Sequence, residues 1–144
     1  MEFKNRGAFH EFAIENTYIA GIVLSGTEVK SLRAGKLSFN DSYCIFHQGE
    51  LFVKSLHISE YSFGTTQKHE PLQDRKLLLT KKELRKWEAK TKEKGYTIVP
   101  LRIFFNEKNI AKMEIGLGKG KKLHDKRETI KKRDTEREMK RYLK

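Results

Sequence analysis

The chain has 144 residues, enough for one domain, and its 31 lysines and arginines against 19 aspartates and glutamates give a net charge of +12. This excess indicates an acidic partner, and nucleic acid is preferred over an anionic membrane. No segment approaches the roughly 20 apolar residues of a membrane-spanning helix, and the N-terminus lacks the apolar core of a signal peptide. Because Cys44 is the single cysteine, the sequence excludes an internal disulfide and a cysteine-based zinc site. We therefore expect a cytoplasmic protein with no membrane association, no metal and no cofactor.

The N-terminal segment alternates between polar stretches and short apolar runs. Residues 1–8 are polar, and we expect them to be mobile. Residues 12–14 and 18–24 read as two short strands, because both are rich in apolar and β-branched or aromatic side chains. The polar residues 15–17 between them have the composition of a turn.

A short helix is predicted near residues 26–34. Ser25 or Thr27 can cap its N-terminus, and Gly35 can end it. Glu28 lies in the first turn of this helix and is most simply the partner of a nearby lysine or arginine.

The middle of the chain contains a predicted hairpin. Residues 42–47 and 50–57 are rich in strand-forming side chains, and Gln48-Gly49 between them is typical of a tight turn. Residues 58–76 form a longer connection with aromatic and basic side chains. Its aromatic rings could stack on bases or cover one end of the sheet.

A second helix and a second hairpin follow. Thr80 and Glu83 have the spacing of a capping box, which predicts a helix over residues 81–94. Residues 96–105 and 110–117 then read as two strands joined by a short polar turn. About six short strands and two helices predict a mainly β fold, an OB-fold-like antiparallel six-stranded β-barrel.

Residues 116–122 alternate glycine with leucine and lysine, which predicts a loose backbone or a close approach to a partner. The spacing does not match a Walker A phosphate loop.

Residues 116–144 hold 12 of the 31 basic residues and only 5 of the 19 acidic ones. We therefore divide the chain into a barrel, residues 1–117, and a basic tail, residues 118–144. The tail has too few apolar side chains to fold alone, so we expect it to be disordered when free and helical when bound to a polyanion.

Three other functions remain open on composition alone. A general binder of single-stranded RNA would carry the same charge. His124 beside Asp125 could act as an acid and base in RNA cleavage, but adjacent residues in a flexible segment do not form a preorganised site. We therefore do not expect an enzyme. A membrane-surface protein is the third possibility.

His10 lies in a basic, polar stretch of the chain. It is equally suited to contacting RNA, by stacking on a base, or to an ordinary surface position.

Four blocks of residues occur in one order along the chain and together are far more specific than any block alone. They are Gly26-Thr27-Glu28-Val29-Lys30-Ser31-Leu32-Arg33-Ala34-Gly35-Lys36, Asp41-Ser42-Tyr43, Arg75-Lys76-Leu77-Leu78-Leu79, and Gly118-Lys119-Gly120-Lys121-Lys122 with His124-Asp125-Lys126-Arg127. With these blocks the sequence resembles the SmpB family, the SsrA-binding proteins of trans-translation, from about residue 5 to the C-terminus.

The resemblance implies a monomeric, non-enzymatic protein that binds the tRNA-like domain of transfer-messenger RNA. It also implies delivery of that RNA to the vacant A site of stalled ribosomes. In that picture the tail occupies the decoding site of the small subunit and the empty mRNA channel, where it becomes helical.

The resemblance and the basic blocks also assign residues to these contacts. The residues expected to bind transfer-messenger RNA are Asn5, Arg6, His10, Arg33, Lys36, Arg75, Lys76, Lys119, Lys121 and Lys122. The residues expected to engage the ribosome are His124, Asp125, Lys126, Arg127, Lys131, Lys132 and Arg133. Two positions depart from the family pattern, with Ile19 in place of an acidic residue and Gln73 in place of a basic one.

Overall fold

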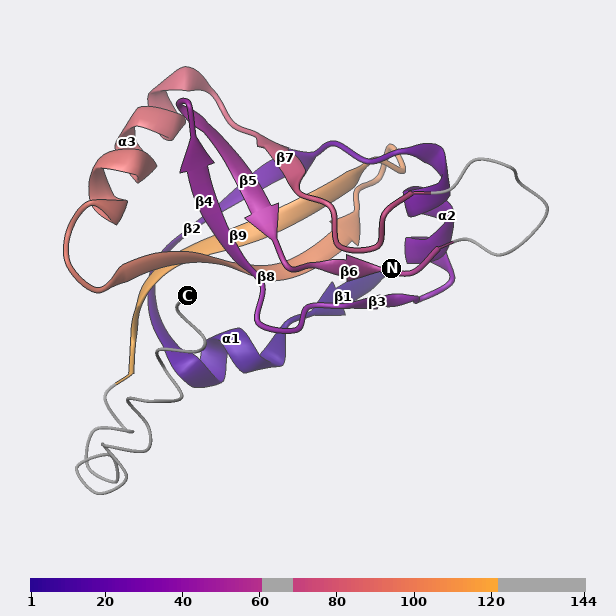
Figure 1. Ribbon diagram of the computed structural model, residues 1–144, viewed down its shortest axis with the longest axis horizontal. Coiled ribbons are helices and arrows are strands. Elements are labelled where there is room, and N and C mark those ends of the chain that lie inside the picture. The colour runs from indigo at the N-terminus through magenta and orange to yellow at the C-terminus, as the bar shows by residue number, and fades with distance from the viewer. Residues whose placement is uncertain (61–68, 122–144) are drawn as a thin grey trace.

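The computed structural model describes residues 1–60 and 69–121 as an antiparallel β-barrel with three short helices (Figure 1). The strands are β1 (Glu2–Lys4), β2 (Phe12–Ile22), β3 (Leu37–Ser38), β4 (Tyr43–His47), β5 (Glu50–Lys54), β6 (His57–Ile58), β7 (Arg75–Leu78), β8 (Tyr96–Phe105) and β9 (Ala111–Gly120). The helices are α1 (Arg6–Glu11), α2 (Gly26–Arg33) and α3 (Lys81–Thr91). The mainly β class with short helices is confirmed.

Six strands of the described chain close into a ring. They pair in the order β8-β4-β5-β7-β2-β9, and β9 pairs again with β8. Strand β1 is added to β8, while β3 and β6 form a separate small sheet. The ring is weakest between β4 and β8, where the single paired position is Cys44 with Ile98. A closed six-stranded barrel was expected from the sequence, but one of its strands, β7, begins inside the connection expected over residues 58–76.

Both predicted hairpins are present. The β4–β5 turn places Gln48 at φ 52° and Gly49 at φ 79°, the left-handed pair that suits a two-residue hairpin turn. Strands β8 and β9 pair along almost their whole length, with one register shift between Pro100 and Arg102.

The prediction of two strands within residues 12–24 is wrong. Strand β2 is continuous from Phe12 to Ile22, and the polar residues 15–17 lie inside it. The register with β9 shifts between Ile14 and Asn16, so the polar run forms an irregularity instead of a turn. Pairing with the full length of β9 keeps β2 extended through this run.

The N-terminus is also more ordered than predicted. Strand β1 pairs with β8, and the main-chain amide of Asn5 donates to the Leu101 carbonyl at 2.8 Å. The Asn5 side chain is buried, and its Nδ2 donates to the Pro100 carbonyl at 2.8 Å. These contacts fix the entry into α1.

Of the two alternatives expected for residues 116–122, a loose backbone or a close approach, the structure shows a close approach at Gly116 and Gly118, and it is made to neighbouring strands of the barrel. A Cβ on Gly118 would lie 2.6 Å from the Ala13 carbonyl oxygen, and one on Gly116 would lie 2.9 Å from a methyl carbon of Leu101. Only glycine lets β2 and β9 approach this closely. Strand β9 therefore reaches Gly120, and the barrel extends beyond the predicted boundary at residue 117.

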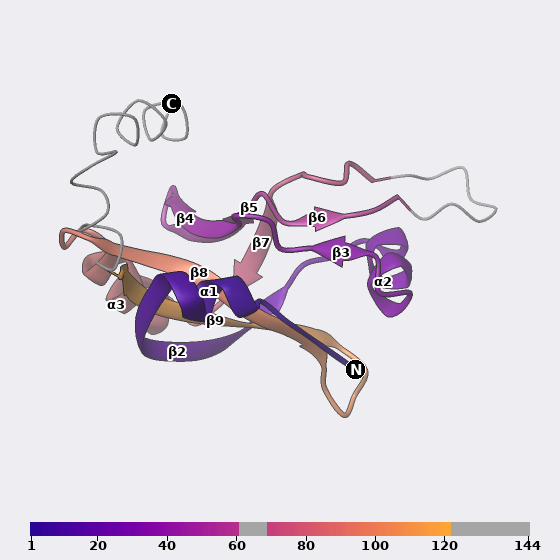
Figure 2. The same cartoon turned by 90° about the horizontal axis from the view of Figure 1, so that it is seen from below.

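Helices α2 and α3 lie at opposite ends of the barrel (Figures 1 and 2). Helix α2 begins with a complete capping box between Ser25 and Glu28. At the start of α3, Thr80 Oγ1 accepts from the Glu83 amide, but the Glu83 carboxylate accepts from Trp87 Nε1 at 3.1 Å. Trp87 is buried and anchors α3 on the core.

Candidate nucleic-acid interface

Helix α1 is hydrogen-bonded to the residue that follows β9. The main-chain amide of Lys121 donates to the Glu11 carbonyl at 2.9 Å, and Lys121 Nζ donates to the Phe9 carbonyl at 3.0 Å. Both carbonyls belong to the last turn of α1, where a cation is favoured by the helix dipole. Segments more than 100 residues apart in sequence, carrying His10 and Lys121, therefore lie side by side.

Lys119 is held beside an aromatic ring. Its Nζ lies 4.9 Å from the ring centroid of Tyr96, and Lys90 Nζ of α3 lies 5.1 Å from the same centroid. The Tyr96 hydroxyl donates to Glu15 Oε1 at 2.7 Å, and this hydrogen bond raises the pKa of Tyr96. Two cations thus lie against one neutral ring at this end of the barrel.

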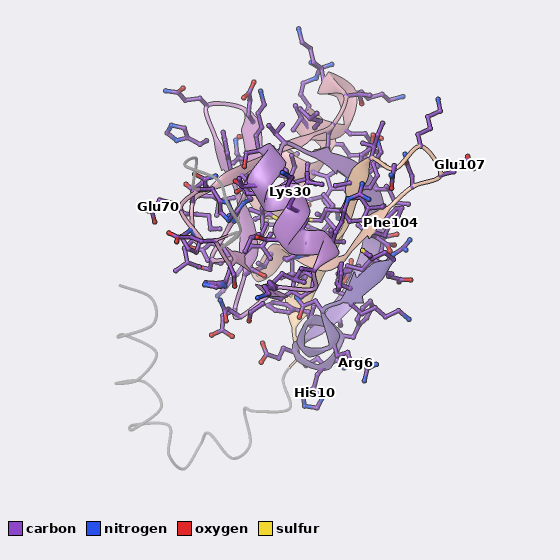
Figure 3. All side chains as sticks on the ribbon, turned by 90° about the vertical axis from the view of Figure 1, so that its right-hand side faces the viewer. Arg6, His10, Lys30, Glu70, Phe104 and Glu107 are labelled. Atoms are coloured by element: carbon purple, nitrogen blue, oxygen red, sulfur yellow. The ribbon has the colours of Figure 1, made fainter. Side chains whose placement is uncertain are left out.

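The C-terminus of α2 approaches the beginning of α1. Arg6 and Gly35 line a common cleft of about 500 Å³. Arg33 precedes Gly35 by two residues at the C-terminus of α2. Its guanidinium is 4.6 Å from the Phe105 ring centroid. Figure 3 shows Arg6 and His10 projecting from α1 at the edge of the barrel.

We call the exposed basic side chains along this edge the basic strip. None of its members forms an ion pair with a residue of the described ranges 1–60 and 69–121, so its charge is available to a partner. Its members are Arg33, Lys36, Arg6, His10, Lys121 and Lys119.

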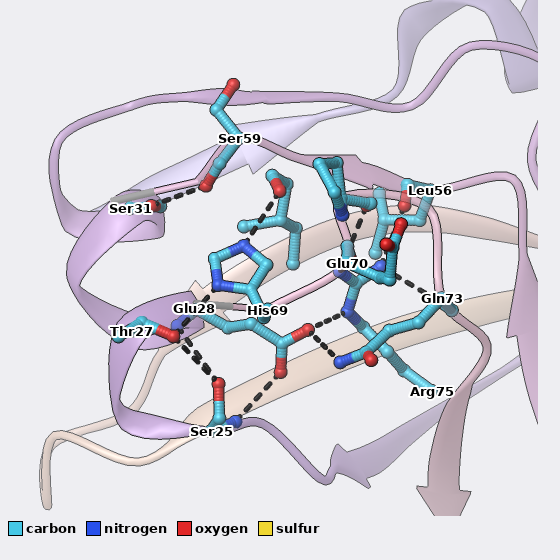
Figure 4. Close-up of polar contacts among 12 residues, drawn as sticks. Ser25, Thr27, Glu28, Ser31, Leu56, Ser59, His69, Glu70, Gln73 and Arg75 are labelled. Carbon is cyan, nitrogen blue, oxygen red and sulfur yellow. Dashed lines mark hydrogen bonds and ion pairs between the residues drawn. The ribbon is translucent and has the colours of Figure 1, made fainter. Parts of the chain in front are cut away.

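The structure corrects the assignment of Arg75 as an RNA contact. Its side chain is 1% exposed, and its Nε lies 2.5 Å from Glu28 Oε2 (Figure 4). The other guanidinium nitrogens donate to the carbonyls of Leu56, Gln73, Glu70 and Pro71. Arg75 is therefore a structural residue, and Glu28 has the arginine partner that the sequence predicted for it.

The assignment of Asn5 as an RNA contact is corrected for the same reason, because this side chain is also buried and hydrogen-bonded. Its side chain amide already donates to the Pro100 carbonyl, and the residue is 9% exposed. It positions α1 instead of facing a ligand.

Lys76 lies away from the basic strip. Its strand, β7, is opposite β8 in the ring, and Lys76 Nζ forms an exposed ion pair with Glu50 at 2.8 Å. Lys122 and the seven ribosome-engaging residues predicted in the tail lie outside the described residues.

The two departures from the family pattern have different surroundings. Gln73 donates from Nε2 to Glu28 Oε2 at 2.8 Å, so it takes part in the Arg75 network. Ile19 is 49% exposed on β2 and faces solvent.

Sequence reasoning missed three residues of these networks. Tyr96 and Lys90 are brought together only by the return of the chain from α3 into β8. His69 is buried, and its Nε2 donates to the Ile58 carbonyl at 2.9 Å while Nδ1 accepts from Thr27 Oγ1 at 2.8 Å. A strand pattern in the sequence could have paired Tyr96 with Lys119, but nothing in it signals the role of His69.

Two further properties of the described residues concern membranes and metals. No helix among them is long and apolar enough to cross a membrane. They also contain no group of three or more histidine, cysteine, aspartate or glutamate side chains placed to hold a metal ion.

Comparisons with known proteins agree on one family. A family model described as "SmpB protein" matches residues 2–144. The SsrA-binding protein of Phocaeicola vulgatus is 53% identical over 144 residues, which cover all of this chain and 96% of the relative. The SsrA-binding protein of Geobacter sulfurreducens is 54% identical over 135 residues, which cover 94% of this chain and 88% of the relative.

A solved structure also matches the fold. It is described as "tmRNA-SmpB: a journey to the center of the bacterial ribosome" and superposes with a TM-score of 0.74 at 47% identity. The match covers 90% of this chain and 94% of the other. The chain therefore belongs to the SmpB family.

Proposed function

We propose that this chain is a cytoplasmic, non-enzymatic RNA-binding protein of trans-translation. It binds the tRNA-like domain of transfer-messenger RNA and delivers it to the vacant A site of stalled ribosomes. The relatives named above are called SsrA-binding proteins, none of those names denotes an enzyme, and the matching structure is named for tmRNA, SmpB and the bacterial ribosome.

The observation that carries this proposal is the junction of α1 with the end of β9. It places His10 beside Lys121, with Arg6 and Lys119 nearby on either side, and none of these four side chains forms an ion pair with a described residue. An RNA backbone is the complement of such a strip, because each phosphate neutralised by a cation releases counterions. Contacts of this kind recognise the shape of a folded RNA and carry no base code.

The tail completes the proposal. Its ribosome-engaging residues are His124, Asp125, Lys126, Arg127, Lys131, Lys132 and Arg133. We assign them to the decoding site and the empty mRNA channel of the small subunit, where an anionic surface compensates the entropy cost of folding the tail as a helix. Lys122 connects this tail to the basic strip.

A competition experiment tests the proposal. The full chain is bound to its own tRNA-like RNA at about 0.15 M salt, and unlabelled competitors are added. A folded tRNA-like competitor should displace the RNA at a concentration at least tenfold lower than an unstructured RNA of equal length. Equal or better displacement by the unstructured RNA would identify a general single-strand binder instead.

A further inference from the structure

The ring of Tyr96 brings together two lysines from different elements. Tyr96 is the first residue of β8 and pairs directly with Lys119 of β9. The Nζ atoms of Lys119 and of Lys90, from α3, lie 4.9 Å and 5.1 Å from the centroid of its ring. Both distances are within the about 6 Å at which an aromatic face attracts an ammonium group. A cation of α3 is therefore held next to a member of the basic strip.

Glu15 holds this ring from the other side of β9. Strand β9 lies between β2 and β8 in the barrel, and the Tyr96 hydroxyl donates across it to Glu15 Oε1 at 2.7 Å. A hydrogen bond to a carboxylate is stronger than one between neutral groups. The ring of Tyr96 also packs against the core. Its orientation is therefore fixed by packing and by a hydrogen bond from a residue 81 positions away in sequence.

The position of Glu15 in β2 is unusual. The register between β2 and β9 shifts between Ile14 and Asn16, so Glu15 has no paired residue in β9. An extra residue of this kind commonly re-aims a side chain next to a functional site. Glu15 forms no ion pair with a described residue, and a carboxylate beside a cationic surface weakens the attraction of that surface for a polyanion. A carboxylate at this place therefore calls for a role other than its charge.

We propose that Tyr96 and Glu15 are positioning residues for RNA binding, which hold Lys119 and Lys90 at the phosphate backbone. Helix α3 thereby contributes a phosphate contact, through Lys90, to the surface formed by the basic strip. A lysine that is already held at a ring loses less side-chain freedom when it binds a phosphate. This inference rests on the proposed RNA-binding function.

Lys90 remains available for such a contact. Its described ion pair is with Glu93 of the following turn, at 3.7 Å, and the two side chains are 37% and 56% exposed. An exposed pair at this separation contributes little, because both groups stay hydrated. A phosphate can therefore replace Glu93 as the partner of the Lys90 ammonium group without leaving a buried charge unpaired.

Glu15→Ala gives the sharpest test, because charge and position predict opposite effects. Removal of a carboxylate beside a basic surface should by itself strengthen binding of the tRNA-like RNA. If Glu15 positions the ring and its two lysines, affinity should instead fall about two- to fivefold, the loss of one exposed cation–aromatic contact. Glu15→Gln keeps an oxygen that accepts from the hydroxyl but has no charge. It should therefore bind at least as tightly as wild type.

Tyr96→Phe tests the same hydrogen bond from its other end. It keeps the ring, loses the hydroxyl, and should lower affinity about as much as Glu15→Ala does. In the Tyr96→Phe background, Glu15→Ala should no longer weaken binding, because only the effect of charge remains. The melting temperatures of these variants should stay within about 3 °C of wild type, since the hydrogen bond is exposed.

Lys90→Ala tests the contribution of α3. It should weaken binding of the tRNA-like RNA and reduce the slope of log K against log salt by about 1, the loss of one phosphate contact. Lys81→Ala is the matched control. Lys81 is exposed at the start of α3, about two and a half turns before Lys90, so it projects from the opposite side of the helix. This control should leave affinity and slope unchanged.

The outcomes separate this inference from the proposed function. Binding by Glu15→Ala that equals or exceeds wild type would overturn the inference, and so would an unchanged salt slope in Lys90→Ala. A loss of affinity in Glu15→Ala together with a melting temperature lowered well beyond 3 °C would assign Glu15 to the fold and would also overturn it. In each of these cases the wild-type chain still binds the RNA. A wild-type chain that does not bind the tRNA-like RNA would refute the proposed function, and this inference with it.

Discussion

Arg75 and Glu28 form a buried ion pair between α2 and the start of β7, with 1% and 2% of their side chains exposed. The guanidinium also binds four main-chain carbonyls, and the carboxylate accepts from the Ser25 amide at 2.8 Å. The pair therefore joins α2 to β7 and to the connection that precedes β7 (Figure 4).

Removal of one partner of this pair should be strongly destabilising. Arg75→Met leaves the Glu28 carboxylate buried without its charge partner and should lower the free energy of unfolding by about 3–5 kcal/mol. Lys76→Met is the matched control, because its ion pair with Glu50 is exposed and contributes about 0–1 kcal/mol. Urea denaturation of both variants measures the difference. Equal stabilities would contradict the structural role given to Arg75.

Glu28 should make stability depend on pH. Burial raises the pKa of this carboxyl, but hydrogen bonds from the Ser25 amide, Arg75 and Gln73 outweigh burial and lower it below the ordinary 4.5. The stabilisation is therefore complete above about pH 4.5, and it declines as the pH falls from there through the folded pKa, because the unfolded state then binds more protons. Urea midpoints between pH 7 and pH 3 should fall less steeply for Glu28→Gln than for wild type. Parallel profiles would assign the acid sensitivity to other carboxylates.

The close approach of β2 and β9 predicts different effects for two neighbouring glycines. Gly118→Ala places a methyl group against the Ala13 carbonyl and should lower the free energy of unfolding by about 1–3 kcal/mol. A Cβ on Gly120 meets no atom within 4 Å, so Gly120→Ala should change it by less than about 0.5 kcal/mol. Thermal melting of the two variants decides between close packing and a flexible segment, since flexibility predicts equal effects.

Cys44 should be unreactive in the folded protein. It is 5% exposed on β4, and burial raises the pKa of its thiol. Because the thiolate is the reactive form, a thiol reagent should modify Cys44 slowly at pH 8 and rapidly in concentrated urea. Rapid modification of the native protein would show that the weak pairing between β4 and β8 opens and exposes Cys44.

The sequence predicted the elements that have strong local signals. Gln48-Gly49 marked one hairpin, and alternation along β9 marked the other. It did not predict β1 and α1, because their polar residues are ordered by distant partners such as Pro100 and Leu101.

The errors at the site arise because both assignments depend on contacts between distant segments, which the sequence does not show. Composition does not distinguish a surface arginine from one that is buried against a carboxylate, so Arg75 was assigned to RNA. The alternation of glycine with lysine indicated flexibility, but the positions of Ala13 and Leu101 that exclude a Cβ are known only from the folded barrel.

Binding of the tRNA-like RNA as a function of salt tests the central claim that the basic strip contacts the RNA backbone. Lys119→Ala and Lys121→Ala should each weaken binding and reduce the slope of log K against log salt by about 1. The control is Lys108→Ala, in the turn at the opposite end of β9, which should leave affinity and slope unchanged. If Lys108→Ala lowers the slope as much as the strip variants do, or if the strip variants leave it unchanged, the basic strip is not the RNA-binding surface.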